Sequence, residues 1–367
     1  MTIRAAFDVH VIGQRATGNE TYAEGLLRAF RARPPSDIEL FFYGRRDGST
    51  SAGDFRGIWP DTPYLRIPIA TPITLALDRV DVAHFQYISP PLCTAAVVLT
   101  VHDLSFERFP HYFRPAFTRR MRSLMPWMTR RAARLIAVSN ATRDDLAELY
   151  GIDPGRVDVI YNGASDDFRP VEDRESLRPR LARFGLTRPF IVCVGNLCRR
   201  KNQARVVRAF ARLVERGIEH DLVLIGKEDP PTGQEVREEI ELSGAAGRIK
   251  VAGFVSREEL VALYNLAEFS VYASHYEGFG LPLVESMACG TPVLTSRASC
   301  LPEIAGEAAL LVDPSDDDDI MEGMGRMIED AALRARLRAA GLERSRAFRW
   351  ERATELTLDC YRKAAGR

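Results

Sequence analysis

Two glutamates in a glycine-rich stretch are the residues of this sequence best suited to carry chemistry. Glu277 and Glu285 lie eight positions apart and are separated by Gly-Phe-Gly-Leu-Pro-Leu-Val. A strand predicted at 269–272 precedes them and a helix follows, so Glu277 should lie in a loop and Glu285 one turn into the helix. A carboxylate on the helix can accept both hydroxyls of a ribose, whereas one in the loop reaches toward the group attached to a diphosphate. The spacing alone is weak evidence, so the surrounding residues carry the prediction.

The residues between the two glutamates suit a site for phosphate. Gly278 and Gly280 allow the backbone to approach a ligand closely, and Pro282 suits the first position of a helix. The free N–H groups of this helix start would then face a phosphate or another polar ligand. From this stretch we take as donor-binding candidates Gly278, Phe279, Gly280 and Leu281.

A second loop supplies cations. The strand predicted at 190–194 leads into Gly-Asn-Leu-Cys-Arg-Arg-Lys-Asn, residues 195–202. Lys201 could bind a diphosphate as a point charge and Arg200 as a fork, and both would offset the charge that builds on a leaving group. The alternative is an ordinary solvated basic loop.

Polar residues also follow strands in the first half of the chain. His102 follows the strand predicted at 97–101, which is a ligand-facing position, although a lone histidine is more often structural. His84 is a weaker candidate of the same kind. Gly13 and Gly18 lie in the loop after the first predicted strand, where glycines are also common for steric reasons.

Alternating strands and helices must position these residues, and the pattern runs through the chain twice. In the first half we predict strands at 3–7, 38–43, 80–84, 97–102, 135–138 and 157–160, and in the second half at 190–194, 222–225, 249–252, 269–272, 292–295 and 309–312. The predicted fold class is α/β, with two doubly wound, Rossmann-like domains facing across a cleft. The predicted boundaries are 1–168 for the first domain, 169–347 for the second, and 348–367 for a helix that crosses back to the first. Ligands of such sheets bind beyond the carboxyl ends of the strands.

With these motifs, the chain resembles the family 4 retaining glycosyltransferases of the GT-B fold, whose E-x7-E signature matches Glu277 and Glu285. The resemblance covers nearly the whole chain. It implies that Glu285 contacts the ribose and that Glu277 and His102 lie beside the transferred sugar. It also implies that Lys201 binds the diphosphate, and that the loop ending at Val255 reads the base through its backbone.

Two further features of the family bear on the predicted site. Asn196 stands where the family commonly has an arginine, and Arg200 compensates as in the Arg-Lys-Asn subset of the family. The loop that holds Gly13 and Gly18 resembles the glycine loop that faces the donor diphosphate and the acceptor. The predicted site is therefore catalytic at Glu277, His102, Lys201 and Arg200, and donor-binding at Glu285, Gly13, Gly18, Gly278, Phe279, Gly280, Leu281, Asn196 and Val255.

The resemblance also implies a mechanism. It is a front-face displacement with retained anomeric configuration, in which the leaving phosphate lies near the incoming hydroxyl and no protein nucleophile is needed. Cations and a helix N-terminus would replace a divalent metal ion, so we expect neither a metal nor a cofactor. The expected partners are a GDP- or UDP-linked sugar donor, with mannose from GDP-mannose as the first guess, and a glycan or lipid-linked acceptor in polysaccharide assembly. Alternatives are a glycoside hydrolase, a nucleotide-sugar epimerase of the same architecture and a catalytically silent sugar-nucleotide-binding subunit.

The composition limits the other partners. Fifty basic and fifty acidic residues give a formal net charge of zero, which does not favour nucleic acid. The N-terminus does not resemble a secretory signal, no stretch is apolar enough to span a membrane, and the six cysteines lack zinc-site spacing. We therefore expect a cytoplasmic protein.

One basic segment leaves a further alternative open. Residues 111–134 contain seven arginines and no acid, interleaved with aromatic residues and broken by Pro126, which is expected to kink or split a helix. The segment either packs on its own domain, lines an acceptor groove or contacts an anionic membrane at its inner face.

Overall fold

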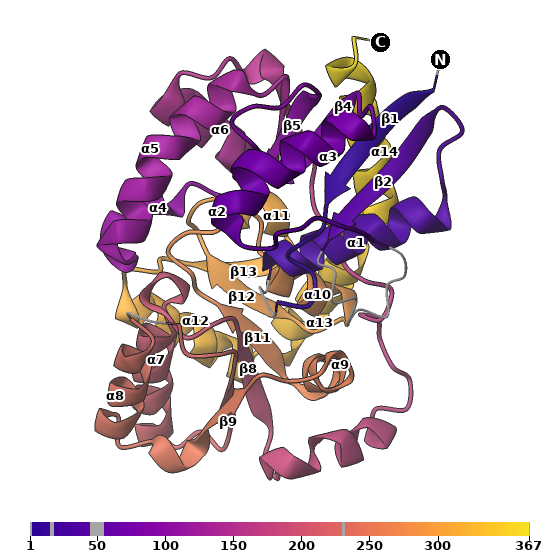
Figure 1. Cartoon of the computed structure of the whole chain (residues 1–367). Helices are drawn as coiled ribbons and strands as arrows, with labels where there is room; N and C mark the ends of the chain where they lie inside the picture. The colour runs from indigo at the N-terminus through magenta and orange to yellow at the C-terminus, as the bar shows by residue number, and fades with distance from the viewer. Residues whose placement is uncertain (1, 15–17, 45–54, 230–231, 367) are drawn as a thin grey trace. The chain divides into compact units, whose positions relative to one another are not determined.

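The computed structural model describes residues 2–14, 18–44, 55–229 and 232–366 of the chain. It divides into two compact units (Figure 1). The first unit comprises residues 1–110, 115–163 and 349–367, and the second comprises 111–114 and 164–348. The predicted domain boundaries after residues 168 and 347 thus differ from the unit boundaries by five residues and by one residue.

The first unit is built on a seven-stranded parallel sheet in the order β3-β2-β1-β4-β5-β6-β7. Its strands are β1 (Ile3–Asp8), β2 (Ile38–Gly44), β3 (Arg56–Gly57), β4 (Val82–Gln86), β5 (Ala96–Val101), β6 (Arg134–Ala137) and β7 (Val157–Val159). Its helices are α1 (Gly18–Ala32), α2 (Pro63–Leu65), the π-helix η1 (Arg66–Ala70), α3 (Thr71–Leu77), α4 (Ser105–Arg108), α5 (Pro115–Arg131), α6 (Asn140–Tyr150) and α14 (Trp350–Ala364), with the short 3-10 turn η3 (Pro154–Arg156). The 3-10 turn η2 (Pro110–Tyr112) begins in this unit and continues into residues 111–114 of the second.

The second unit is built on a six-stranded parallel sheet in the order β10-β9-β8-β11-β12-β13. Its strands are β8 (Phe190–Val194), β9 (Asp221–Ile225), β10 (Ile249–Gly253), β11 (Phe269–Tyr272), β12 (Val293–Ser296) and β13 (Ala309–Val312). Its helices are α7 (Gln203–Glu215), α8 (Gln234–Leu242), α9 (Arg257–Leu266), α10 (Leu281–Ala288), α11 (Leu301–Ala305), α12 (Asp317–Glu329) and α13 (Ala331–Ser345), with 3-10 segments η4 (Glu175–Phe184), η5 (Arg199–Lys201) and η6 (Ala246–Arg248). Two Rossmann-like α/β units are thus present, as predicted.

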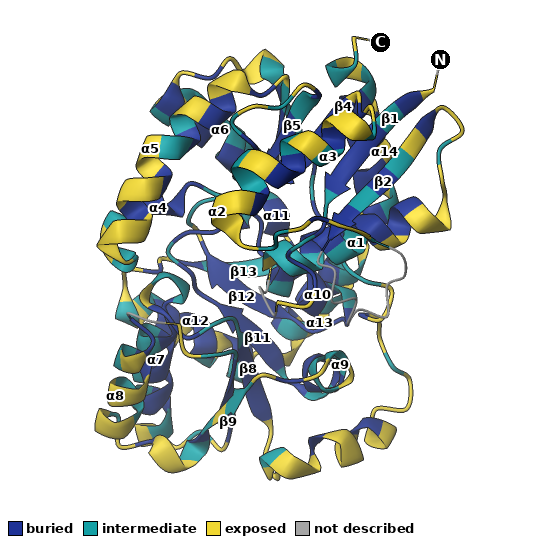
Figure 2. Cartoon of the chain, in the orientation of Figure 1, coloured by how far each residue is buried: buried dark blue, intermediate teal, exposed yellow. Residues whose placement is uncertain are grey.

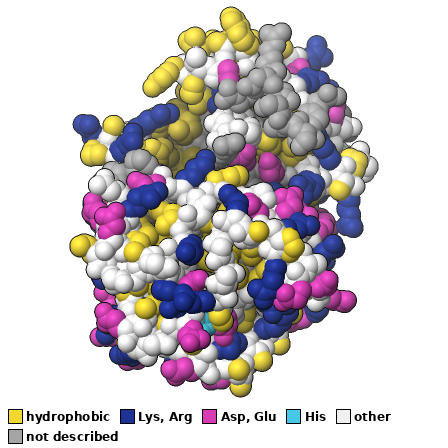
Figure 3. Space-filling view, turned by 90° about the horizontal axis from the view of Figure 1, so that it is seen from below, with side chains coloured by type: hydrophobic (Ala, Val, Ile, Leu, Met, Phe, Trp, Pro, Cys, Tyr) yellow, Lys and Arg dark blue, Asp and Glu magenta, His cyan; other side chains and the backbone are white. Residues whose placement is uncertain are grey.

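The central strands are buried on both faces, which explains their continuous apolar sequences (Figure 2). One face of the second sheet packs against α7 and α12, with Phe210 and Met324 in that core. The other face packs against α9, whose Leu263 and Tyr264 lie in a separate core. Surface charge is mixed: basic and acidic side chains lie interspersed on the face seen in Figure 3.

Helix termini follow the capping chemistry of the sequence. Ser139 precedes α6, and its side chain accepts a hydrogen bond from the Thr142 N–H, while Gly151 ends the helix with φ of +66°. Asn140 is the first helical residue. Asp316 caps α12 by accepting from the N–H groups of Asp318 and Asp319. The acidic run at this point therefore belongs to a helix N-terminus.

Two predictions about helices were wrong or incomplete. Pro126 does not split the basic segment, because α5 continues through it from Pro115 to Arg131. Ser123 and Thr129 place their hydroxyls on backbone carbonyls of the same helix, 2.9 Å from Arg119 O and 2.8 Å from Met125 O. The helical region from 63 to 77 was not named individually, since it contains three prolines, of which Pro63 and Pro72 occupy first-turn positions.

The C-terminal helix α14 belongs to the first unit, where it packs against α1. Gly25 on α1 makes this contact possible, because a Cβ there would lie 2.2 Å from the Trp350 ring. At the other end of α14, the Tyr361 hydroxyl is 2.8 Å from Nδ1 of His84 inside the sheet. The last residues of the chain therefore complete the core of the first unit.

Candidate active site

The second sheet reverses its strand order between β8 and β11, and the loops that follow these two strands lie against each other. Backbone and side chain both join them: the His275 N–H donates to Arg200 O at 2.9 Å, and Asn202 Nδ2 donates to Ala273 O at 3.0 Å. Such a switch point is where open α/β sheets bind ligands. It brings together the cationic loop 195–202 and the loop that contains Glu277.

Glycines allow the neighbouring strand ends to approach. Gly226 after β9 has φ of +143°, and a Cβ there would lie 2.2 Å from Gly195 O after β8. Gln203 then fixes the β8 loop from inside, with Nε2 donating to Gly195 O and Asn196 O at 3.1 and 2.9 Å. The buried side chain of Gln203, at the start of α7, thus fixes the backbone of the cationic loop.

Asn202 is a positioning residue that was not among the predicted site residues. It is buried, has φ of +63°, and donates from Nδ2 to Pro314 O at 2.8 Å as well as to Ala273 O. Asparagine is one of few side chains that tolerate this left-handed conformation. The Lys-Asn dipeptide at the end of a glycine loop was the available signal.

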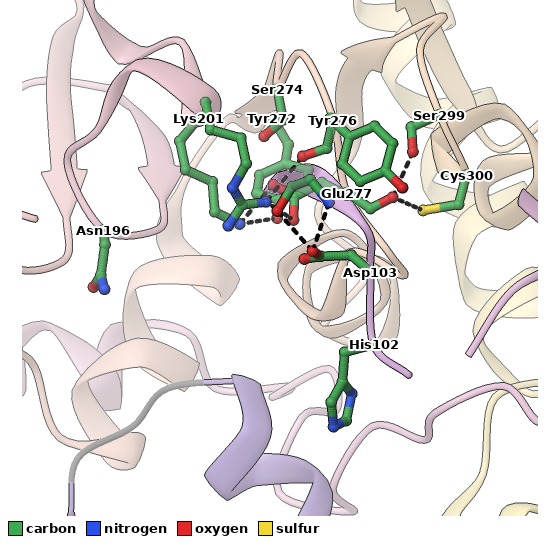
Figure 4. Close-up of polar contacts among 12 residues, drawn as sticks. His102, Asp103, Asn196, Lys201, Tyr272, Ser274, Tyr276, Glu277, Ser299 and Cys300 are labelled. Atoms are coloured by element: carbon green, nitrogen blue, oxygen red, sulfur yellow. Dashed lines mark hydrogen bonds and ion pairs between the residues drawn. The ribbon is translucent and has the colours of Figure 1, made fainter. Parts of the chain in front are cut away.

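An ion cluster forms where the two loops meet (Figure 4). Glu277 Oε2 lies 2.9 Å from Arg200 Nη1, and Glu277 Oε1 lies 2.6 Å from Lys201 Nζ. Burial alone would raise the pKa of the Glu277 carboxyl, but the charges of Arg200 and Lys201 lower it to about 2. Three of the four predicted catalytic residues therefore form one ion cluster, in which Glu277 is buried and Arg200 and Lys201 are partly exposed.

Aromatic and backbone groups complete this cluster. Lys201 Nζ lies 2.6 Å from the Tyr272 hydroxyl, and Arg200 Nη1 also donates to Tyr276 O at 2.9 Å. The Glu277 carbonyl accepts from Ser299 Oγ and from Cys300 Sγ (Figure 4). Burial raises the pKa of the Tyr272 hydroxyl, which therefore stays neutral beside the lysine.

Two buried oxygens of the cluster have no partner with hydrogen-bond geometry in the described part of the chain, Glu277 Oε1 and Ser274 Oγ. The ion pair of Oε1 with Lys201 is close but poorly directed for a hydrogen bond. Buried polar atoms without such partners are rare in proteins. A polar ligand at this edge of the sheet would find both an acceptor and a hydroxyl to bond.

The start of α10 follows within the same loop. Gly280 has φ of +92°, and a Cβ there would lie 2.9 Å from Leu301 Cδ2. Pro282 takes the second helical position and not the first, although its missing N–H is equally harmless there. The side chains of Phe279 and Leu281 are buried, so these residues can contact a ligand only through their backbone groups.

Glu285 lies on α10 in an environment unlike that of Glu277. It is buried, and burial raises the pKa of its carboxyl to about 7, against the opposing effects of Arg257 and a hydrogen bond with Tyr264. The Tyr264 hydroxyl also donates to Pro282 O at 3.2 Å. One carboxylate is thus ionised over the whole physiological range, while the other titrates near neutrality.

The loop predicted to face the base follows β10. The Val255 side chain is buried in the core beside α9, so it is not available to a ligand. Phe254 beside it is 60% exposed, and Lys227 Nζ lies 5.6 Å from the centre of its ring. Asn196 lies in the loop that follows β8, and its Oδ1 accepts a hydrogen bond from the Lys227 N–H at 3.4 Å.

The remaining predicted site residues belong to the first unit. His102 is buried after β5, with Nε2 2.8 Å from Gln86 Oε1 and its ring edge-on to Tyr22. Burial lowers the pKa of His102 to about 4, so the ring is neutral at physiological pH. His84 is a core residue, since Tyr361 and Thr100 occupy its two ring nitrogens and no part of it is exposed. The ligand interpretation of His84 was therefore wrong.

The predicted glycine loop is described only at its ends, because residues 15–17 lie outside the described residues. Gly13 has φ of +85°, and its N–H donates to Glu20 Oε1 at 2.7 Å. Gly18 is the first residue of α1.

Other classes of site were searched for in the described residues. No group of three or more His, Cys, Asp and Glu side chains there could hold a metal ion. All six cysteines are free thiols. None of the helices described is both long and apolar enough to cross a bilayer.

Comparisons with known proteins decide the family. Residues 174–344 match the model of the glycosyl transferases group 1, and residues 4–168 match that of glycosyltransferase family 4. O-antigen chain mannosyltransferase B of Escherichia coli is 32% identical over 270 residues, which cover 72% of this chain and 70% of that protein. The chain belongs to the group 1 glycosyltransferases.

A relative and a solved structure extend this result. The MMP alpha-(1->4)-mannosyltransferase of Mycolicibacterium hassiacum is 33% identical to this glycosyltransferase over 250 residues, which cover 65% of the chain but only 57% of that protein. The structure of sucrose-phosphate synthase from Thermosynechococcus elongatus superposes with a TM-score of 0.77 over 99% of both chains, at 22% identity. That likeness shows the GT-B fold, as predicted.

Proposed function

We propose that this glycosyltransferase moves a hexosyl group from a nucleoside diphosphate sugar to a glycan or lipid-linked acceptor in polysaccharide assembly, with retained anomeric configuration and without a metal ion. The observation that carries the proposal is the ion cluster of Glu277, Arg200 and Lys201 at the switch point of the second sheet. The mannosyltransferases among its relatives support mannose as the first candidate sugar, for which GDP-mannose is our proposed donor.

In this proposal the cluster binds the donor at its diphosphate and its sugar. Arg200 and Lys201 contact the diphosphate and offset the charge that develops on the leaving phosphate, which replaces the role of a divalent ion. The N–H groups at the start of α10 face the same phosphates. Glu277 stays ionised and contacts the sugar hydroxyls, and the departing phosphate itself accepts the proton of the incoming hydroxyl.

In this proposal Glu285 binds the ribose. Its carboxylate is held on the rigid helix α10 by neighbours that include Tyr264. Accepting two hydroxyls compensates a carboxylate whose burial raises its pKa despite the opposing charge of Arg257. Backbone groups of the loop that ends at Val255 read the base, and His102 binds the sugar as a neutral imidazole.

A thermal-shift panel tests donor binding. The wild-type chain is melted with GDP, UDP, ADP and TDP, each with a chelator present, since a ligand of the folded state raises the Tm. We expect one nucleotide at about millimolar concentration to raise the Tm by several degrees. Lys201→Ala should lose most of that rise. No rise with any nucleotide would overturn the donor site.

Product analysis then separates the alternatives. The corresponding donor sugar is incubated with candidate acceptors, and the products are identified by mass spectrometry and NMR. Transfer yields the nucleoside diphosphate and an acceptor glycoside of unchanged anomeric configuration. An epimerase would yield an isomerised donor, a hydrolase would cleave a glycoside without nucleotide, and a silent subunit would bind the donor and yield nothing.

A further inference from the structure

The second unit has a pocket at the edge of its sheet that lies away from the candidate active site. The wall of this pocket includes Phe190, the first residue of β8, together with Glu268 directly before β11 and Pro292 directly before β12. These three strands are neighbours in the sheet (Figure 1). The loop 195–202 and the loop of Glu277 follow the opposite ends of β8 and β11, and the five residues of β8 span roughly 16 Å. The pocket is therefore separate from the proposed donor site.

Arginines dominate the charge of this pocket, called the arginine pocket below. It has a volume of about 530 Å³, and its wall is formed by the start of η4, the loop before β8 and helix α13. A cleft lined by one sign of charge concentrates ions of the opposite sign. The charged side chains of the wall are five arginines, Arg174, Arg178, Arg188, Arg334 and Arg338, and two glutamates, Glu175 and Glu268.

The two glutamates of the wall already have partners. Glu175 pairs with Arg178 at 2.6 Å, and both side chains are largely exposed. One oxygen of Glu268 lies 2.8 Å from Arg334 Nη2, and its other oxygen contacts the His220 ring. The acids of the pocket therefore offset two of its five arginines.

The remaining arginines have weaker acidic partners or none. Arg188 lies 3.8 Å from Asp221, whose same oxygen is 3.0 Å from Arg248. Neither Arg174 nor Arg338 forms an ion pair within the part of the chain that the structure describes. The arginine pocket thus keeps an excess of positive charge at these two guanidinium groups.

Backbone carbonyls hold the two unpaired guanidinium groups in place. Arg174 Nη2 donates to Asn265 O, and Arg338 Nη1 donates to Gly290 O at 2.9 Å. Asn265 is itself buried, and its Oδ1 accepts from the Val171 N–H at 2.9 Å. A carbonyl orients a guanidinium group without neutralising it, and the group has five N–H donors. Donors of both arginines are therefore left for a ligand.

The charge of Arg174 is held at a cost. Burial of part of its side chain lowers the pKa of Arg174, and the like charges of Arg338 and Arg178 add to this effect. Glu175 opposes it. Since arginine stays protonated in proteins, the lowered pKa means that its cation is destabilised, and a bound anion would relieve this.

We propose that the arginine pocket binds a small phosphorylated ligand that carries two or more negative charges. Arg174 and Arg338 contact phosphate oxygens as forks, and the apolar side chains of Phe190, Leu266 and Pro292 face the uncharged part of the ligand. A phosphate ester brings about two charges and three acceptor oxygens, so one group can bond both arginines, whereas a carboxylate brings a single charge.

Size and position define the role of this site. The volume falls within the range of pockets for small molecules, and it exceeds what a single phosphate ion fills. The reacting groups of open α/β sheets lie at the carboxyl ends of the strands. The ligand of the arginine pocket, at the amino ends, therefore takes no part in the transfer itself.

Calorimetric titration of the full chain with fructose 1,6-bisphosphate as a probe tests the proposal. We expect saturable binding that weakens with added salt, and at least tenfold weaker binding of sulfate. The double variant Arg174→Gln, Arg338→Gln should bind the bisphosphate roughly 100-fold more weakly, since each charge-assisted contact contributes about tenfold. Ala335→Glu should weaken binding at least tenfold, because it adds a carboxylate to the wall at an exposed position and removes no side-chain hydrogen bond.

Matched controls separate this site from general charge and from the donor site. Arg336→Gln removes an exposed arginine from the same helix outside the wall and should leave the affinity within about twofold of the wild type. Lys201→Ala should keep the wild-type affinity for the bisphosphate, while Ala335→Glu should keep the wild-type Tm and nucleotide-induced shift. Failure of the donor site would therefore leave this test intact.

Three results would overturn the proposal. They are no binding of the bisphosphate at about 10 mM, equal affinities of the wild type and Ala335→Glu, and an equal loss in Arg336→Gln and the double variant. Equal affinity for sulfate and the bisphosphate would likewise reduce the pocket to a surface that attracts any anion.

Discussion

At the scale of single residues, one buried carboxylate decides how the proposed donor site works. Glu277 pairs with both Arg200 and Lys201 before any ligand is bound, and it offsets part of the charge of these two partly exposed cations. A diphosphate therefore meets a site whose charge is already partly compensated. Binding of the bare nucleotide and stabilisation of a developing charge should respond differently to the loss of this carboxylate.

The substitution Glu277→Gln tests that difference. It keeps the size of the side chain and removes its charge, so we expect turnover to fall by roughly 10²- to 10³-fold. The affinity for nucleoside diphosphate should stay equal or increase up to about tenfold, since both cations are released for the phosphates. Calorimetric titration and initial rates measure the two effects. A parallel loss of affinity and turnover would move Glu277 away from the transferred sugar.

Glu285 makes a prediction about pH, because its folded-state pKa of about 7 lies above the ordinary value of 4.5. The folded state binds this proton more tightly, so the raised pKa costs stability progressively as pH rises from about 4.5 to 7, and fully above that. Glu285→Gln should therefore leave the free energy of unfolding nearly unchanged at pH 4.5 and raise it by up to about 3 kcal/mol at pH 8. Urea unfolding at both pH values measures this.

The same variant has an opposite effect on ligand binding. An ionised carboxylate accepts two ribose hydroxyls, whereas an amide oxygen accepts less strongly, so nucleotide affinity at pH 8 should fall by about tenfold in Glu285→Gln. Wild-type affinity should also rise between pH 6 and 8 more steeply than that of the variant, which shares only the titration of the phosphates. Identical pH profiles would remove Glu285 from the ribose site.

The single residues show where sequence patterns are sufficient and where they fail. Glu277, Lys201 and Arg200 could be recognised because loop, strand and helix signals surround them in a short stretch. The contact of Lys201 with Tyr272 spans 71 residues, and local patterns carry no information on such a pair. His84 was misjudged for the same reason, since its partner Tyr361 lies 277 residues away.

At the scale of elements, the loop after β8 depends on its final residue. Asn202 combines a left-handed backbone with two buried hydrogen bonds that tie the cationic loop to the ends of β11 and β13. Lys201 directly precedes it, so the position of the lysine ammonium depends on this anchor.

Replacing Asn202 separates the two contributions. Asn202→Gly keeps the backbone conformation and loses both hydrogen bonds, which should lower the free energy of unfolding by about 2 kcal/mol. Asn202→Ala also places a Cβ in a left-handed conformation and should cost roughly 1 kcal/mol more. Denaturant titration measures both, with Asn196→Ala in the same loop as a control of small effect. Equal stability of the two variants would contradict the role of the backbone conformation.

Elements were predictable where burial imposes a regular pattern. The central strands of both sheets are apolar on both faces, and their predicted ranges agree with the structure within two residues at each end. The helical segment 63–77 escaped prediction because its outward side is apolar and its prolines interrupt the pattern. A sequence rule that expects charged residues on the solvent-facing side of a helix cannot recognise a helix whose exposed side is apolar.

At the scale of the whole molecule, the two units differ in how the chain builds them. Apart from residues 111–114, the second unit is continuous from residue 164 to residue 348, whereas the first needs α14 from the far end of the chain. Trp350 and Tyr361 fill its core, and Arg362 and Lys363 pair with Asp37 and Asp158. Folding of the first unit therefore has to await the last residues, while the second has all its strands in one segment.

Fragments of the chain test this asymmetry. Residues 164–348 alone should fold cooperatively and, if the donor site is correctly assigned, show a nucleotide-induced Tm shift. Residues 1–163 alone should be aggregated or unfolded, because removal of α14 exposes the buried surface around His84 and Tyr22. Joining 349–367 to residue 163 through a flexible linker should restore cooperative unfolding, measured by circular dichroism. A well-folded fragment 1–163 would show that α14 covers a core that is already stable. Failure of 164–348 to fold would show that the second unit gains its stability from the rest of the chain.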